Sequence, residues 1–436
     1  MSELTILKNG MVVTLDESHR VIEDGSIVIE DDKILDVGKT ADIEKKYKGD
    51  TIISAKKKAV LPGLVDLHYH SSIGRGICDD LPLDEWLNKF IWPKLREMNP
   101  EEAYAGALCS YADSIKSGTT CVNDMYHHMT KVAEAAEKIG IRAVLSSEVA
   151  DEPEGLETIE DNERLFNEKN GAADGRISVH FAIEWVPIAS AEIISKTTEL
   201  AKKYKTGIHI HLNESLGELE LSKKRHGKRP VELAYDLGVL GPDCVAVHCV
   251  WLTDAEIRML QQTGTSVSHN PSSNAKLGSG VARIPDLIAA GVNVGLGHDS
   301  ASCNNSRDMF EVMKWASLVH RAVRVDASLM PAKRILEMAT RNGGKALHLN
   351  IGSIEPGKKA DLILVNLAGT HFTPLILGRD FNLFSHLVYS AHGEDVDTSI
   401  IDGKIVMENR VLRNIDENEV VENATRAMEN VLARIR

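Results

Sequence analysis

The middle of the chain alternates between short apolar runs rich in β-branched residues and segments in which apolar residues recur every three or four positions. The first pattern is typical of buried strands, and the second of amphipathic helices. The predicted strands are residues 60–70, 119–126, 142–149, 177–184, 207–214, 244–251, 265–271 and 293–299. The predicted helices include residues 100–117, 129–139, 190–204, 230–237, 254–263 and 284–290. Strands that alternate with helices over this length predict an α/β fold, a (β/α)8 TIM barrel.

The two ends of the chain carry a different pattern. Between residues 4 and 54, short alternating apolar bursts are separated by turn residues, as is typical of antiparallel strands. Similar bursts occur at 352–366 and 398–406, and residues 417–436 have the pattern of a helix. We therefore predict one small β-sandwich domain built from both chain ends, residues 1–57 and 351–436 with the terminal helix. Residues 58–350 form the barrel in this prediction.

Composition narrows the class of protein. The chain has 436 residues, 43% of them hydrophobic and 26% charged, which is ordinary for a globular protein. A formal net charge of -14 argues against a nucleic-acid partner, because phosphate backbones are bound by clustered Lys and Arg. We find no apolar run long enough for a membrane span, no secretory signal pattern, and no C-x-x-C spacing among the six cysteines. We expect a cytoplasmic protein that binds no membrane.

Four of the predicted strands end in side chains that bind metal ions. His68 and His70 end the first strand, His211 lies in the fifth, His248 in the sixth, and Asp299 ends the eighth. Side chains two apart on a strand share a face, so His68 and His70 can bind one ion together. In a TIM barrel, the carboxyl ends of the strands meet at the active site. Imidazoles with one carboxylate and an open position are typical of a catalytic metal site.

Glu214 follows His211 by three residues, close enough to move protons beside a metal-bound water. A bound divalent ion lowers the pKa of water towards about 7, so the pattern predicts hydrolysis. An isolated His-x-His pair would be explained as well by packing, but His248 and Asp299 at two further strand ends make that explanation weak. The residues do not choose between Zn²⁺ and Fe²⁺, because neutral imidazoles and a carboxylate suit both.

Two motifs resemble a known family. The segment 60–70, Val-Leu-Pro-Gly-Leu-Val-Asp-Leu-His-Tyr-His, resembles the opening motif of the amidohydrolase superfamily. The segment 268–280, Ser-His-Asn-Pro-Ser-Ser-Asn-Ala-Lys-Leu-Gly-Ser-Gly, resembles the branch that deaminates or dechlorinates N-heterocycles. The resemblance covers nearly the whole chain. It implies a homodimer or homotetramer with one divalent ion per subunit, Zn²⁺ or Fe²⁺, held by His68, His70, His211 and Asp299.

The resemblance also implies how the site works. Glu214 would pass a proton to the ring nitrogen of the substrate, and His248 would orient the attacking water or help to deprotonate it. Asp299 would accept the proton of the water while it stays on the metal. The implied enzyme is a metal-dependent aminohydrolase that acts on C–N bonds in cyclic amidines. It would replace an exocyclic amino group of a six-membered N-heterocycle (triazine, pyrimidine, pterin or purine) by hydroxyl and release ammonia.

Two alternatives remain within this branch: deamination of adenosine, 5'-methylthioadenosine or S-adenosylhomocysteine, and hydrolytic dechlorination of a chlorotriazine. In the nucleoside-type deaminases, a Glu that binds ribose hydroxyls occupies the position of Leu95, and a His that contacts the purine occupies the position of Glu184. Both differences favour a small heterocycle over a nucleoside.

Other classes fit the sequence less well. A non-catalytic relative is expected to lack a metal ligand or Glu214, and none is missing. Hydrolases of cyclic amides usually hold two metals bridged by a Lys at the end of the fourth strand, where this chain has Glu184.

Three further residues are predicted to bind the substrate. Glu184 is expected to accept from an N–H group of the ligand, because a carboxylate at a barrel strand end is costly unless paired. Trp92 is a candidate for stacking on a flat ring. Cys303 lies where the triazine deaminases also have Cys. Sequence alone assigns no role to His127, His128 and His298.

Overall fold

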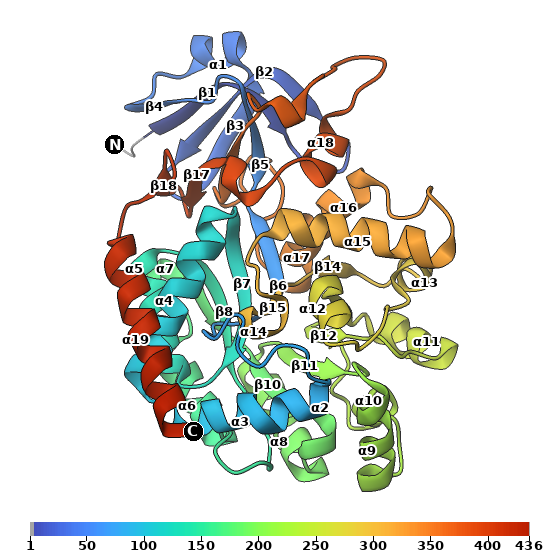
Figure 1. Ribbon diagram of the computed structural model, residues 1–436. Helices are drawn as coiled ribbons and strands as arrows, with labels where there is room; N and C mark the ends of the chain where they lie inside the picture. The colour runs from blue at the N-terminus through green and yellow to red at the C-terminus, as the bar shows by residue number, and fades with distance from the viewer. Residues whose placement is uncertain (1–3, 436) are drawn as a thin grey trace.

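Strands from both ends of the chain pair in one nine-stranded sheet (Figure 1). The computed structural model describes residues 4–435. The strands from the beginning of the chain are β1 (Leu4–Val13), β2 (Val21–Glu30), β3 (Lys33–Lys39), β4 (Thr51–Ser54) and β5 (Lys58–Pro62). Those from the end are β16 (Leu362–Asn366), β17 (Val396–Ile401), β18 (Lys404–Glu408) and β19 (Val411–Leu412). Their order is β19-β18-β17-β16-β5-β1-β2-β3, with β4 beside β1.

The middle of the chain forms two five-stranded parallel sheets, as alternating apolar runs and helices require. One has the order β15-β6-β7-β8-β9 and the other β10-β11-β12-β13-β14. The strands are β6 (Leu64–His70), β7 (Thr119–Tyr126), β8 (Arg142–Ser147), β9 (Ile177–Val179), β10 (Phe181–Trp185), β11 (Ile208–Leu212), β12 (Cys244–His248), β13 (Ser266–His269), β14 (Val294–Leu296) and β15 (Asp299–Ser300).

Three predicted strands are divided in the structure. The predicted fourth strand breaks at His180 into β9, which pairs with β8, and β10, which pairs with β11. The eighth breaks into β14, beside β13, and β15, beside β6. The first breaks at Gly63, where an added Cβ would lie 2.0 Å from Thr120 Oγ1. This close approach separates β6 from β5, which pairs with β1 and β16 instead of belonging to a parallel sheet.

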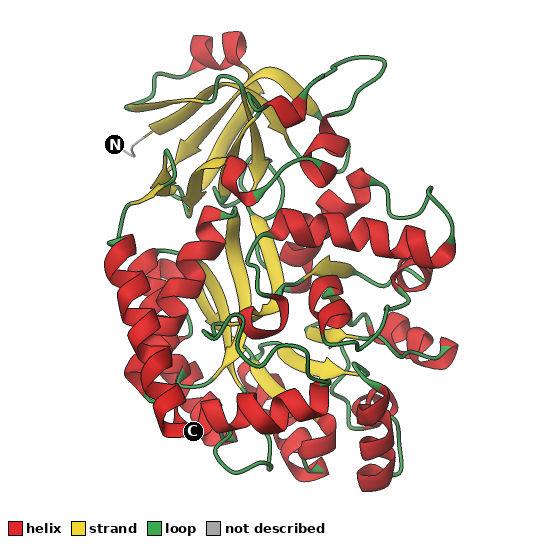
Figure 2. Ribbon diagram, in the orientation of Figure 1, coloured by secondary structure: helices red, strands yellow, loops and turns green. Residues whose placement is uncertain are grey.

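Helices lie around the outside of the parallel strands (Figure 2). The six predicted helices correspond, within one residue at each end, to α4 (Pro100–Lys116), α5 (Met129–Ile139), α8 (Ala191–Tyr204), α10 (Pro230–Asp236), α11 (Asp254–Thr263) and α13 (Ile284–Ala289). Helix α4 begins with a capping box, in which Asn99 accepts from the backbone N–H of Glu102 and the Glu102 carboxylate accepts from that of Asn99. The terminal helix α19 (Glu417–Ile435) packs on α4. No helix between residues 4 and 435 is long and apolar enough to cross a bilayer.

Several helices have no counterpart in the prediction, and for the shortest of them a segment of about one turn carries too little periodicity to be recognised. Those of two turns or more are α1 (Thr40–Lys46), α6 (Ile159–Lys169), α9 (Leu216–His226), α15 (Met309–Arg324), α16 (Ala332–Met338) and α18 (Leu383–Tyr389). The shorter ones are α2 (Leu83–Trp86), α3 (Trp92–Glu97), α7 (Ala172–Gly175), α12 (Pro271–Lys276), α14 (Ala301–Asn304) and α17 (Arg341–Ala346). A π-helix, Leu87–Ile91, joins α2 to α3.

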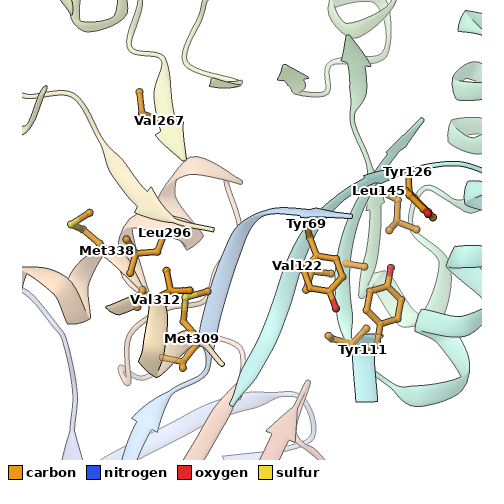
Figure 3. Packing of buried hydrophobic residues seen from close by; sticks show 14 of the residues in the cluster. Tyr69, Tyr111, Val122, Tyr126, Leu145, Val267, Leu296, Met309, Val312 and Met338 are labelled. Atoms are coloured by element: carbon orange, nitrogen blue, oxygen red, sulfur yellow. The ribbon is translucent and has the colours of Figure 1, made fainter. Parts of the chain in front are cut away.

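The largest hydrophobic core lies between the parallel strands and their helices. Figure 3 shows two parts of it on either side of β6, one with Tyr69, Tyr111 and Tyr126 and the other with Leu296 and Met338. The nine-stranded sheet has a second core, to which both chain ends contribute, for example Val12, Ile29 and Leu362. The largest core includes Leu64 and Tyr69 and so fixes β6, whose carboxyl end carries two of the predicted metal ligands.

A buried ion cluster ties the nine-stranded sheet to β8. Arg142 donates from Nε to Asp361 Oδ2 at 2.6 Å and from Nη2 to Asp402 Oδ1 at 2.9 Å, and all three residues are buried. Replacing Arg142 with Met is expected to lower the free energy of unfolding by about 3–5 kcal/mol, because Asp361 is left buried without its cation. Urea unfolding measures the loss. Arg164→Met, which removes an exposed partner of Asp161, is the control and should leave the free energy of unfolding unchanged.

A loss below about 1 kcal/mol for Arg142→Met would contradict the assignment of the cluster as a structural tie.

Candidate functional site

The predicted metal ligands converge at the carboxyl ends of β6 and β11 and at β15, and the predicted catalytic His248 ends β12 beside them. His68 Nε2 lies 3.2 Å from His211 Nε2, and Asp299 Oδ1 lies 3.6 Å from the Nε2 atoms of both His68 and His70. All four residues are buried. In the described part of the chain, two groups of side chains could hold a metal ion, His68 with His70 and Asp299, and His68 with His211 and His248. The sequence prediction therefore selected residues that the fold brings together.

The ring of His70 is held by acceptors behind it. His70 Nδ1 donates to the carbonyl oxygen of Met125 at 2.5 Å and lies 2.7 Å from Glu148 Oε1. The other oxygen of Glu148 lies 3.2 Å from His127 Nε2. Glu148 is buried, and although burial raises the pKa of its carboxyl, His127 and His70 hold that pKa well below its usual range. Sequence reasoning missed Glu148 because it belongs to no motif and its partners come from other strands.

His211 and His68 are oriented in a similar way. His211 Nδ1 donates to the carbonyl oxygen of Glu184 and lies 3.1 Å from its carboxylate oxygen Oε2. His68 Nδ1 lies 3.0 Å from His209 Nε2. Such contacts fix the tautomer of a metal-binding imidazole and turn its other nitrogen towards the ion.

The donor set fits a divalent cation. With their Nδ1–H groups committed, His70 and His211 can offer only Nε2 to an ion, beside the oxygens of Asp299. Although burial opposes it, Glu148 raises the pKa of His70 and Glu184 raises the pKa of His211 to about 10, and a bound cation would take the place of the Nε2 proton. Acceptors that face one another without a proton between them repel, and a cation among them removes the repulsion. Burial holds the pKa of His68 well below its usual range, so this ring is neutral, as a ligand must be. Imidazoles with one carboxylate suit Zn²⁺ or Fe²⁺.

Glu214 stands beside this cluster. Its Oε1 accepts from Ser279 Oγ at 2.9 Å, its backbone N–H donates to Glu218, and its Oε2 lies 3.7 Å from His248 Nε2. Burial, with the nearby charge of Asp299, raises the pKa of Glu214 to about 7. A carboxyl with this pKa can carry and release a proton at neutral pH.

His248 faces the carboxylates with a free ring nitrogen. Its Nδ1 lies 2.8 Å from Asn274 Oδ1, and its Nε2 lies 3.7 Å from Asp299 Oδ2. Burial lowers the pKa of His248 to about 4, so the ring is neutral. With Nδ1–H donated to the amide oxygen of Asn274, Nε2 is left to accept a proton or a hydrogen bond.

A cavity opens over the cluster. Its polar lining includes Glu148, Glu184, Glu214 and Lys94, and its apolar lining comes from Leu83, Trp86, Leu87, Ile91 and Leu277. Of the three predicted substrate contacts, only Glu184 lines it. Trp92 is half-buried and packs on the hydrophobic core. The thiol of Cys303 donates to the carbonyl oxygen of Ser300 at 3.2 Å and packs with Leu83 and Trp86. Substrate contacts by these two side chains stay predictions.

The structure gives positions to the three histidines without an assigned role. His298 Nδ1 lies 2.8 Å from Asp66 Oδ2, and its backbone N–H donates to Asp66 Oδ1 at 3.0 Å, so this pair fixes the start of β15 beside β6. His127 is buried against Glu148. His128 is half-buried, and its Nε2 donates to the carbonyl oxygen of Met98 at 2.9 Å.

Known deaminases are similar to this chain over nearly its whole length. The chain is 42% identical to 5'-deoxyadenosine deaminase of Methanosarcina mazei over 99% of both chains. It is 39% identical to 5-methylthioadenosine/S-adenosylhomocysteine deaminase of Thermoanaerobacter pseudethanolicus, over 98% of this chain and 99% of that one. The crystal structure of an adenosine deaminase from Xanthomonas campestris with bound zinc superimposes with a TM-score of 0.93, at 31% identity and 98% coverage of each chain.

Residues 59–406 match the amidohydrolase family, and this range contains all the residues of the site. The family and the deaminases similar to this chain confirm the enzyme class expected from the sequence, a hydrolase that acts on C–N bonds in cyclic amidines. The match over these residues shows that the chain belongs to the amidohydrolase family.

Proposed function

We propose that this protein is a metal-dependent deaminase of adenosine-type nucleosides. It converts 5'-deoxyadenosine, 5'-methylthioadenosine or a related compound to the corresponding inosine and releases ammonia. The observation that carries the chemistry is the buried carboxyl of Glu214, with a pKa of about 7, beside His248 and the ligand cluster. The substrate class is supported by relatives that match nearly the whole chain and are named deaminases of 5'-deoxyadenosine and of methylthioadenosine. These relatives favour a nucleoside substrate over the small heterocycle that Leu95 and Glu184 had suggested.

The residues of the site suit each proton transfer. His68, His70, His211 and Asp299 would hold a Zn²⁺ or Fe²⁺ ion, which would lower the pKa of a water and so supply a nucleophile at neutral pH. Asp299 and the free Nε2 of His248 accept the proton of that water. Glu214 donates its proton to the ring nitrogen next to the amino-bearing carbon, which neutralises the negative charge that builds up there. A C–O bond forms at the amino-bearing carbon. The proton taken up by Asp299 or His248 then passes to the amino group, the C–N bond breaks and ammonia leaves, and the new hydroxyl returns its proton to Glu214.

The arrangement of the strands is part of this proposal. We infer that the two five-stranded sheets close into one (β/α)8 barrel, because the chain passes from one sheet to the other at β9–β10 and again at β14–β15. A separate β-sandwich domain of residues 1–57 and 351–436, zinc as the metal, cytoplasmic location and a homodimer or homotetramer stay predictions.

A substrate panel tests the proposed function. Ammonia release is measured with adenosine, 5'-deoxyadenosine, 5'-methylthioadenosine and S-adenosylhomocysteine, and with melamine, cytosine, guanine and isoxanthopterin. We expect kcat/KM for at least one adenosine compound to exceed that for the free heterocycles by roughly two orders of magnitude, because a pocket built around a sugar loses its polar contacts without it. Ammonia from the free heterocycles alone, or chloride from a chlorotriazine, would contradict the proposal.

A further inference from the structure

Lys94 is a buried cation in the wall of the cavity. Lys94 lies on α3, which follows the π-helix, and only 1% of its surface is exposed. It is the single Lys or Arg among the described residues that line the cavity. Sequence reasoning compared the neighbouring Leu95 with a sugar-binding residue, but Leu95 lies in the hydrophobic core and does not line the cavity.

The ammonium of Lys94 has no hydrogen-bond acceptor or ion-pair partner among the described residues. Its Nζ lies 5.4 Å from the ring centre of Phe90 and 5.7 Å from that of Tyr126. Burial lowers the pKa of Lys94 to about 8, with Glu148 opposing the shift, so the amine is still mostly protonated at neutral pH. Aromatic rings compensate a buried charge only in part. An unpaired ammonium costs free energy in the unliganded protein, and an acceptor on a ligand removes that cost.

The charges around the cavity select the kind of acceptor. Glu148, Glu184, Glu214 and Asp299 all line it, so carboxylates outnumber the one ammonium. A ligand phosphate or carboxylate at Lys94 would have to approach these groups. Even with a divalent ion at Asp299 and a proton on Glu214, the carboxylates of Glu148 and Glu184 remain. A neutral acceptor, such as a hydroxyl oxygen or a ring nitrogen, satisfies Lys94 without this repulsion.

We propose that Lys94 determines substrate specificity by donating a hydrogen bond to a neutral acceptor of the nucleoside, either a ribosyl hydroxyl or a purine ring nitrogen. This inference rests on the proposed function and names a contact within it. Lys94 takes no part in the proton transfers, which Glu214, His248 and Asp299 carry out. Its contribution is to binding and to discrimination among adenine compounds.

The test combines Lys94→Met with substrate analogues. The variant should lose roughly ten- to a hundredfold in kcat/KM on the best adenosine substrate, as expected for a hydrogen bond from a charged donor. The same comparison is made with the 2'-deoxy, 3'-deoxy, 3-deaza and 7-deaza analogues. On the analogue that lacks the contacted atom, Lys94→Met should cost nothing further, because two deletions from one contact are not additive. Calorimetric binding of the inosine product should weaken in parallel.

Structural damage and function are separated by controls. Removing an unpaired buried charge should leave the melting temperature of Lys94→Met unchanged or higher. Lys89→Met, on the exposed side of the same helical segment and paired with Glu85, should keep wild-type kinetics.

Three results would overturn the inference: no loss on the adenosine substrate, the same loss on every analogue, or a larger loss on adenosine 5'-monophosphate. If the wild-type protein deaminates no adenosine compound, the proposed function itself fails and the assignment of Lys94 fails with it.

Discussion

Replacing His68 with Ala is expected to remove the bound metal and the activity together. His68 belongs to both groups of side chains that could hold an ion, and its Nε2 lies within 3.6 Å of His211 and Asp299. Without it, the remaining acceptors no longer surround a cation. Activity should fall by roughly three orders of magnitude or more, because the ion contributes several kcal/mol to the reaction. Metal content is measured on the purified variant together with kcat/KM.

His348→Ala is the matched control, because His348 is exposed and pairs with Asp243 away from the cavity. It should retain full metal content and turnover. Circular dichroism and a cooperative unfolding transition establish that His68→Ala is folded. A folded His68→Ala variant that keeps one ion per chain and near wild-type turnover would contradict the assigned ligand set.

Replacing Glu214 with Gln should keep the metal and remove turnover. The amide has nearly the same shape and can still accept from Ser279, but it has no carboxyl proton to give. We expect kcat to fall by about 10²- to 10⁴-fold, the usual contribution of general acid–base catalysis, with a smaller change in KM. Steady-state kinetics and metal analysis on the same preparation measure both quantities.

The control for Glu214→Gln is Glu220→Gln, which changes an exposed carboxylate on α9. It should have wild-type kinetics. If Glu214→Gln also had wild-type kcat, the proton for the ring nitrogen would have to come from another group, and the role of Glu214 would be wrong.

The parallel strands were predictable because buried strands leave continuous apolar runs. The breaks within them were not. His180 separates β9, which pairs with β8, from β10, which pairs with β11. The position of this break depends on which strands become neighbours in the fold. Gly63 ends β5 through close packing on Thr120, a residue far along the sequence. Such divisions follow from tertiary packing, which a local pattern does not contain.

The ligand cluster was predictable for a similar reason. His68, His70, His211 and Asp299 lie at the ends of apolar runs, and the carboxyl ends of the strands in a barrel meet at one site. Glu148 and Lys94 were not predictable in this way. Glu148 is recognisable only through its contacts with His70 and His127. Lys94 lies on a helix of six residues, and a lysine in such a segment is normally exposed. Its burial results from packing between Phe90 and Tyr126.

The most direct measurement quantifies the products formed from 5'-deoxyadenosine. It compares the protein reconstituted with one zinc ion per chain with the metal-depleted protein. We predict one ammonia and one 5'-deoxyinosine for each nucleoside consumed by the zinc-loaded protein, and no conversion by the metal-depleted protein. Absence of ammonia from this and the other adenosine compounds, or equal turnover with and without metal, would contradict a metal-dependent nucleoside deaminase.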